Sequence, residues 1–124
     1  MALTQGRGVD IIYDPVNGPT FEESLRCLAW SGRILILGFL GGAPALARTN
    51  YLLIKGIEAI GVRIGGLNEN HPEIAAANTT ALLELAAQGK VKPRIWRRYP
   101  LAQAADAVQA LIDRAVIGKA VLVG

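Results

Sequence analysis

The sequence has few of the side chains on which catalytic and metal sites are usually built. Its 124 residues include one cysteine, Cys27, and one histidine, His71. A single cysteine excludes an internal disulfide framework and a zinc site of several cysteines, and a single histidine excludes a site of several histidine ligands. No serine stands in a G-x-S-x-G motif, so a hydrolase triad has no support. We therefore predict no catalytic side chain and no metal site, and we expect a partly buried, structural Cys27 and a surface His71.

Long hydrophobic runs and a strong charge of one sign are also missing. The uninterrupted apolar segments fall far short of the roughly 18 residues that a membrane-spanning helix needs. Residues 1–8 contain no apolar stretch typical of a secretory signal, so we expect a cytoplasmic protein without membrane contact. Thirteen basic and ten acidic residues leave a net charge of +3, which is too weak to indicate a polyanionic partner by itself.

What the sequence does contain is apolar residues in alternating strand and helix patterns. Hydrophobic residues make up 52% of the chain, enough to fill a core and to leave apolar surface for a partner. Short apolar runs predict strands at residues 9–13, 33–37 and 57–62. This alternation favours a parallel α/β unit with helical crossovers.

Two helices are predicted between these strands. The first opens near Pro19, where Thr20 and Glu23 have capping-box spacing, and it ends at Ser31-Gly32. The second is short, covers residues 50–55 and stops at Gly56.

The second half of the chain predicts a long helix, an extended basic stretch, a further helix and a last strand at residues 120–123. Pro72 suits the first turn of the long helix, and Gly89 suits its end. Its apolar stripe comprises Ile74, Ala77, Ala81, Leu82 and Leu85. The apolar side of the later helix comprises Ala104, Ala105, Val108, Leu111 and Ile112.

Two loops that follow predicted strands are candidates for ligand binding. Residues 38–42 read Gly-Phe-Leu-Gly-Gly, and glycine lets a ligand approach the backbone closely. In open α/β sheets ligands bind where such loops leave the strands, but glycine-rich turns also occur there without any ligand. Residues 14–18 read Asp-Pro-Val-Asn-Gly, which is ordinary turn chemistry, although Asp14 could also act as a general base or a ribose ligand.

Five basic residues gather between residues 90 and 98, namely Lys90, Lys92, Arg94, Arg97 and Arg98. Trp96 and Tyr99 accompany them, and this combination can bind single-stranded nucleic acid. The alternative is a solvated strand face with Val91, Ile95 and Trp96 turned inward. We favour the solvated face and expect no nucleic-acid partner, because no recognised RNA- or DNA-binding motif accompanies the run.

Together these segments resemble a known family. The residues concerned are Gly8–Gly18, Phe21–Arg33, Leu37–Phe39, Leu52–Val62, Gly89–Pro93, Tyr99–Leu101 and Gly118–Leu122. In this order and spacing the chain resembles the C-terminal portion of the medium-chain dehydrogenase/reductase family. It is most similar to the zinc-independent NADPH:quinone oxidoreductase branch, over about residues 6–123.

The resemblance implies the C-terminal half of a Rossmann-type parallel sheet, with three strands and helical crossovers, plus a C-terminal helix-strand tail. Residues 1–89 would be part of a cofactor-binding domain, and residues 90–124 a tail that packs on the catalytic domain in relatives. The implied activity is hydride transfer from NAD(P)H to a quinone or an activated alkene. No zinc site is implied.

The resemblance also implies which residues lie beside the cofactor. They are Pro15, Val16, Gly38, Phe39, Leu40, Val62 and Arg63. The sequence lacks the G-x-G-x-x-G loop that holds the pyrophosphate of NADP or NAD in relatives. We therefore expect weak or absent cofactor binding and little or no activity for this chain alone.

An alternative is a non-enzymatic assembly module. The strand at residues 9–13 would lack a neighbour, and an unpaired apolar strand edge is a template for pairing with another chain. The strand at residues 57–62 resembles the one that pairs subunits in family dimers. We expect a homo-oligomer that forms through one or both edges, or docking onto a separately encoded N-terminal half.

Overall fold

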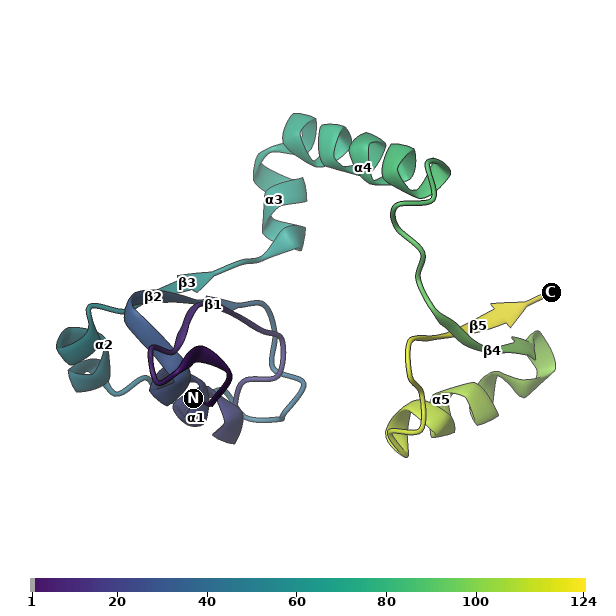
Figure 1. Cartoon of the computed structure of the whole chain (residues 1–124). Helices are drawn as coiled ribbons and strands as arrows, with labels where there is room; N and C mark the ends of the chain where they lie inside the picture. The colour runs from purple at the N-terminus through teal and green to yellow at the C-terminus, as the bar shows by residue number, and fades with distance from the viewer. Residues whose placement is uncertain (1) are drawn as a thin grey trace. The chain divides into compact units, whose positions relative to one another are not determined.

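The computed structural model describes residues 2–124 and divides the chain into two compact units (Figure 1). The first unit runs to Asn70, and the second covers His71–Gly124. A short 3-10 helix, η1 (Ala2–Thr4), precedes the first strand. Each unit has its own parallel sheet.

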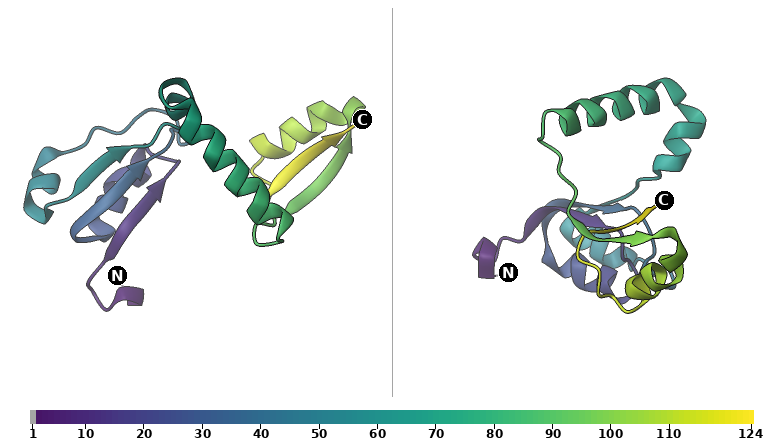
Figure 2. Two further views of the ribbon diagram at one scale, coloured as in Figure 1. Left: turned by 90° about the horizontal axis from the view of Figure 1, so that it is seen from above. Right: turned by 90° about the vertical axis from the view of Figure 1, so that its right-hand side faces the viewer.

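The first unit contains a three-stranded parallel sheet in the order β1-β2-β3 (Figure 2). Its strands are β1 (Val9–Asp14), β2 (Leu28–Ile36) and β3 (Glu58–Gly61). The predicted α/β class and the sequential order of three parallel strands are confirmed. With this order, β1 and β3 are the two edge strands among the described residues.

Two helices pack against one face of this sheet. They are α1 (Pro19–Cys27) and α2 (Thr49–Lys55). The core between helices and sheet consists of Phe21, Leu25, Leu28, Ile34 and Ile57, and Ile34 at the centre of β2 is fully buried. Burial of such side chains contributes roughly 1.5–3 kcal/mol each, so this core is the main source of stability in the unit.

The opposite face of the sheet is open. Ile11 and Tyr13 on β1 are 58% and 68% exposed, and Ile60 on β3 is also exposed. Between them, Arg33 Nε donates to Glu58 Oε2 at 3.0 Å across β2 and β3. Parallel sheets are normally covered on both faces, so this apolar face lacks its usual cover within the unit.

The predicted boundary between the first helix and the second strand was wrong. The helix ends at Cys27 rather than at Ser31-Gly32, and β2 begins at Leu28 rather than at Arg33. Val9 pairs with Leu28 whereas Ile11 pairs with Arg33, so the intervening residues of β2 form an irregularity in the ladder. Ser31 there has a positive φ of 57°. Leu28 therefore belongs to β2 and reaches the core from the strand.

Two local predictions in α1 were also wrong. Gly18 is the N-cap, and Thr20 lies inside the helix, where its hydroxyl donates to the carbonyl of Asn17 at 2.8 Å. No capping box forms, because Pro19 already begins the helix. Cys27 is exposed rather than partly buried, since it lies at the end of the helix and outside the core.

Helix α3 (Ile64–Asn70) was missed by sequence reasoning. Gly65 and Gly66 are poor helix formers, so the sequence gives no helix signal at this position. The structure instead shows a helix, in which Leu67 N donates to Arg63 O at 3.1 Å. The side-chain amide of Asn70 donates to Gly66 O at 2.7 Å.

The second unit begins with α4 (Pro72–Ala87), which matches the predicted long helix. The apolar stripe predicted for it is not buried, because no residue of α4 is buried. The two-stranded parallel sheet follows, formed by β4 (Ile95–Pro100) and β5 (Lys119–Val123). A 3-10 turn, η2 (Leu101–Gln103), leads into α5 (Ala104–Ile112).

The expected inward side of α5 was wrong. Val108, Leu111 and Ile112 are exposed, whereas Ala107 is buried and Ala104 is half-buried. The helix therefore packs through its small alanine side chains, which allow α5 to approach its neighbours closely. Val91 and Ile95 are likewise exposed rather than turned inward, and Trp96 is half-buried.

Among residues 2–124, none of the helices combines the length and the apolar character required to cross a lipid bilayer.

One lysine links the two helices of the first unit. The Lys55 ammonium at the end of α2 donates to the carbonyls of Leu25, Arg26 and Leu28 at 3.2, 2.9 and 2.9 Å. These carbonyls lie at the C-terminus of α1, where backbone acceptors lack helical partners and a positive charge is favourable. Lys55 therefore caps α1 from a distant part of the chain.

We predict that Lys55→Met lowers the free energy of unfolding by about 1–2 kcal/mol, because three partly buried or exposed carbonyls at the end of α1 lose a charged donor. Urea denaturation followed by circular dichroism measures the change. Lys90→Met is the matched control, since the Lys90 side chain makes no hydrogen bond or ion pair with another residue in the described part of the chain. Equal stability of the two variants would contradict the capping role.

Candidate functional site

The carboxyl ends of the three strands meet at one edge of the first sheet. β1 ends at Asp14, β2 at Ile36 and β3 at Gly61, and these residues share one row of the parallel register. The loops after the strands leave the sheet at this edge, which is where open α/β sheets bind their ligands.

The loops after β1 and β2 are bonded to each other through the backbone. Leu37 N donates to Asp14 O at 2.9 Å, Leu40 N to Pro15 O at 3.2 Å, and Gly41 N to Val16 O at 2.8 Å. Pro15, Val16 and Leu40 thus lie together beside the end of β1. The loops after β1 and β2 are therefore in direct contact.

Glycine is required at the point where these loops touch. A Cβ added at Gly41 would lie 2.9 Å from the carbonyl oxygen of Val16 and 3.1 Å from that of Asn17. A Cβ at Gly38 would lie 3.3 Å from the carbonyl oxygen of Pro15. The glycines of this loop therefore serve close packing of backbone on backbone.

A hollow of about 350 Å³ lies between the ends of β2 and β3. It is lined by Ile36, Leu37, Gly38, Phe39, Gly61, Val62 and Arg63. The structure thus brings together four predicted residues, Gly38, Phe39, Val62 and Arg63. The other three, Pro15, Val16 and Leu40, lie outside this lining, at the end of β1. Sequence reasoning missed Ile36, Leu37 and Gly61, which read only as strand residues.

The hollow is largely apolar and has backbone groups available at its rim. Among the described residues, none accepts a hydrogen bond from the backbone amides of Gly38 and Phe39. Val62 N, by contrast, donates to Ile36 O at 2.9 Å and holds the end of β3 against β2. Arg63 is the charged residue of the lining, and its guanidinium pairs with Glu69 of α3 at 3.0 Å. The hollow can accept a flat apolar group, with two free donors beside it.

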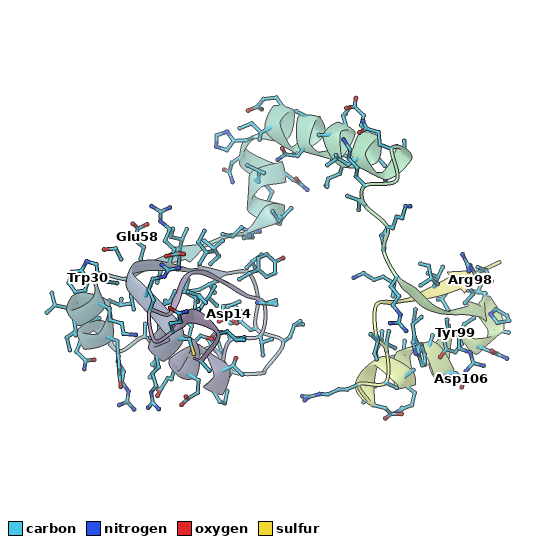
Figure 3. The ribbon with its side chains drawn as sticks, viewed as in Figure 1. Asp14, Trp30, Glu58, Arg98, Tyr99 and Asp106 are labelled. Carbon is cyan, nitrogen blue, oxygen red and sulfur yellow. The ribbon has the colours of Figure 1, made fainter. Side chains whose placement is uncertain are left out.

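Asp14 serves the turn rather than offering a base at the surface. It is 4% exposed, and its Oδ1 accepts from the amides of Val16 and Asn17 at 3.0 and 2.7 Å (Figure 3). Oδ2 accepts from the Asn17 side chain at 3.3 Å. The turn interpretation of residues 14–18 therefore agrees with the geometry, since both carboxylate oxygens are occupied.

Neither Cys27 nor His71 belongs to this site. Cys27 is exposed at the end of α1, and His71 lies in the second unit, where its Nδ1 is 3.7 Å from Glu73. Within residues 2–124, no group of three His, Cys, Asp or Glu side chains is placed to hold a metal ion.

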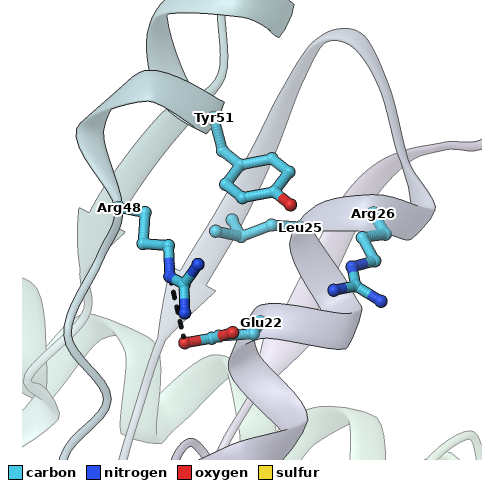
Figure 4. A pocket seen from close by; sticks show the side chains of 5 residues that line it. All are labelled: Glu22, Leu25, Arg26, Arg48 and Tyr51. Atoms are coloured by element: carbon cyan, nitrogen blue, oxygen red, sulfur yellow. Dashed lines mark ion pairs between the residues drawn. The ribbon is translucent and has the colours of Figure 1, made fainter.

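A smaller depression lies between α1 and the segment that enters α2 (Figure 4). Leu25 and Tyr51 form part of its wall, and the Arg48 guanidinium lies 3.6 Å from the Glu22 carboxylate. It has no room for a water-sized sphere, so we do not regard it as a ligand site.

The second unit contains a wider, polar hollow of about 410 Å³ between β4 and α5. Its lining includes Trp96, Arg97, Tyr99, Asp106 and Asp113. The Arg97 guanidinium lies 4.9 Å from the centre of the Tyr99 ring, and Tyr99 is 3% exposed. Tyr99 is therefore not available as a platform on which a nucleic-acid base could stack.

Comparison with protein families gives a match over almost the whole chain. The family model described as zinc-binding dehydrogenase matches residues 1–122. The chain is similar to quinone oxidoreductase-like protein 2 of Mus musculus, with 35% identity over 120 residues that cover 97% of this chain and 34% of the relative. A homologue of that protein from Nematostella vectensis is 32% identical over 121 residues, covering 97% and 33%. The chain thus spans about a third of the length of the curated relatives it matches.

A solved structure also matches almost the whole chain. The crystal structure of Escherichia coli quinone oxidoreductase complexed with NADPH matches with a TM-score of 0.85 and 28% sequence identity. The match covers 99% of this chain and 38% of that one.

We predict that Gly41→Ala destabilises the loops at this edge by about 1–3 kcal/mol, because the added methyl group would press on two carbonyl oxygens of the neighbouring loop. Thermal unfolding measures the change. Gly65→Ala is the control, since a Cβ there meets nothing within 4 Å and alanine favours helix α3. Destabilisation by Gly65→Ala as large as that by Gly41→Ala would contradict the close-packing explanation.

Proposed function

The chain belongs to the zinc-binding dehydrogenase family, and from that premise we propose that it forms the nicotinamide-facing part of an NAD(P)H site. The reaction proposed for the whole site is hydride transfer to a quinone or an activated alkene. The observation that carries this proposal is the hollow between Gly38-Phe39 and Val62-Arg63.

The residues of the hollow fit a nicotinamide ring with its carboxamide. Ile36, Leu37 and Val62 offer apolar contacts to a flat ring, and Gly38 presents backbone without a side chain. The free amides of Gly38 and Phe39 can donate to a carboxamide oxygen. When bound, the reduced cofactor supplies the hydride, and the residues of this chain bind and orient its ring and keep water from it.

Similarity to a relative solved with this cofactor supports the same assignment. The Escherichia coli structure is described as complexed with NADPH, and it shares the fold over 99% of this chain. We propose NADP(H) as the preferred cofactor on that ground. NAD(H) stays an alternative.

Zinc does not fit the described residues, despite the family's name. Three or four ligands of nitrogen, sulfur or oxygen are needed for zinc, and no group of three candidate side chains occurs in residues 2–124. We therefore assign no metal-holding role to the residues of this chain in the proposed hydride transfer.

The pyrophosphate half of the site has no counterpart in this sequence. There is no G-x-G-x-x-G loop at a helix N-terminus, and such a loop provides the amides that hold the phosphates. We therefore propose that the 124 residues by themselves bind the cofactor weakly and have little or no activity.

We predict a dissociation constant for NADPH on the order of millimolar or weaker, equivalent to about 4 kcal/mol or less. A titration followed by amide NMR shifts measures it, and the shifts should concentrate at Gly38, Phe39 and Val62. Gly38→Val should weaken them, because a side chain there would press on the carbonyl oxygen of Pro15 and displace this wall of the hollow, whereas Gly65→Val in α3 should not. Micromolar binding, or shifts confined to the second unit, would contradict the proposal.

A second candidate function is assembly without catalysis, and the open sheet face favours it. Ile11, Tyr13 and Ile60 are exposed on one face, and β1 and β3 each have a free edge among the described residues. We propose that this chain forms a homo-oligomer through one or both edges, or binds a separate polypeptide that provides the missing half of the sheet. A cytoplasmic location stays a prediction from the sequence.

We predict that the protein sediments as a dimer or larger species at tens of micromolar. Ile60→Lys should weaken a dimer that uses β3, by about tenfold or more, because it places a charge in a partly desolvated strand. Ile54→Lys is the control, since Ile54 is exposed on α2 and belongs to neither edge strand. A compact monomer at this concentration would contradict the proposed association.

A further inference from the structure

Two buried polar side chains lie beside the hollow and have no role in the proposed function. Asp14 is 4% exposed and Asn17 is 3% exposed, and they are the buried polar or charged residues of the described chain. Buried polar groups are costly unless they are hydrogen-bonded. All buried side-chain nitrogen and oxygen atoms in residues 2–124 have a hydrogen-bond partner, so this pair is fully satisfied.

Asn17 connects two loops that are far apart in the sequence. Its side-chain nitrogen donates to Asp14 Oδ2 at 3.3 Å, and its Oδ1 accepts from the amide of Ala45 at 2.7 Å. Ala45 lies at the far end of the loop that begins at Gly38. The same loop is bonded to residues 15 and 16 through Leu40 and Gly41, so it is held at both of its ends.

A simple turn would not need this side chain. Asp14 alone accepts the two backbone amides that close the turn. The side-chain amide of Asn17 adds a donor toward Asp14 and an acceptor toward Ala45, and an asparagine side chain supplies both from one group. Asn17 also has a positive φ of 57°, which asparagine tolerates better than most residues.

We propose that Asn17 is a positioning residue for the hollow. Its bond to Ala45 fixes residues 41–45 against the turn after β1, and this holds Gly38 and Phe39 as a preformed wall. The inference rests on the proposed function for its effect on the cofactor. The loop constraint itself can be tested without any ligand.

The expected consequence is a loss of preorganisation rather than a loss of fold. Without the bond, the loop samples more conformations, and a ligand must then order it on binding. The core of Phe21, Leu25 and Ile34 keeps the sheet intact, and Ala45 packs only against its margin as a partly buried residue.

Two variants break the two bonds of Asn17 separately. Ala45→Pro removes the backbone amide that donates to Asn17 and leaves the Asp14 turn in place. Asn17→Asp keeps an acceptor for Ala45 but removes the donor to Asp14 and sets two carboxylates side by side. Ala47→Pro is the control, because no described residue accepts a hydrogen bond from the Ala47 amide.

Hydrogen exchange of the full chain gives the first measurement. In Ala45→Pro the amides of Leu40 and Gly41 should exchange about tenfold faster, whereas those of Val16 and Asn17 stay protected by Asp14. Asn17→Asp should expose all four amides, and Ala47→Pro none. Unchanged exchange of Leu40 and Gly41 in Ala45→Pro would overturn the inference, even if Asn17→Asp failed to fold.

NADPH titration gives the second measurement. Ala45→Pro should reduce the NMR shifts of Gly38 and Phe39 several-fold at equal NADPH concentration, while circular dichroism shows that the variant is still folded. Full shifts on a loosened loop would overturn the positioning role. If the wild-type chain shows no shifts at all, the proposed function fails, and the exchange data still decide whether Asn17 holds the loop.

Discussion

The pairing of β2 with a parallel strand on each side is the constraint on which the first unit depends. Ile34 at the centre of β2 is fully buried in the core that the sheet shares with α1 and α2. Its neighbours in the register are Ile12 on β1 and Ala59 on β3. Because all three strands run in one direction, their carboxyl ends converge in a single row. The loops that form the hollow therefore meet as a result of topology, and side chains only refine the arrangement.

Strong periodic patterns made much of this fold predictable. The β-branched and apolar runs near residues 9–13 and 33–37 are unambiguous, and Gly56 ends α2 in a left-handed conformation as its position in the sequence indicates. The candidate residues of the hollow followed from strand ends and from resemblance. Four of them, Gly38, Phe39, Val62 and Arg63, lie together around one volume.

The remaining features depend on contacts that one sequence does not reveal. The irregular start of β2 depends on its pairing with Val9, and α3 forms despite two glycines, which are poor helix formers. Lys55 caps a helix nearly thirty residues away, and Asn17 binds an amide 28 residues further along the chain. The composition of residues 14–18 signals a turn, but nothing in it identifies the distant amide.

The open sheet face has a consequence for the solution behaviour of the two units. Residues 1–70 contain six basic and six acidic residues, whereas residues 71–124 contain seven basic and four acidic ones, so the net charge of +3 lies entirely in the second unit. The part of the molecule with the exposed Ile11 and Tyr13 is thus electrically neutral, and neutral apolar surfaces have little long-range repulsion to keep copies apart. The basic second unit provides that repulsion, and added salt screens it over about 10 Å at 0.1 M. The net charge that can keep copies of this chain apart therefore lies outside the candidate site.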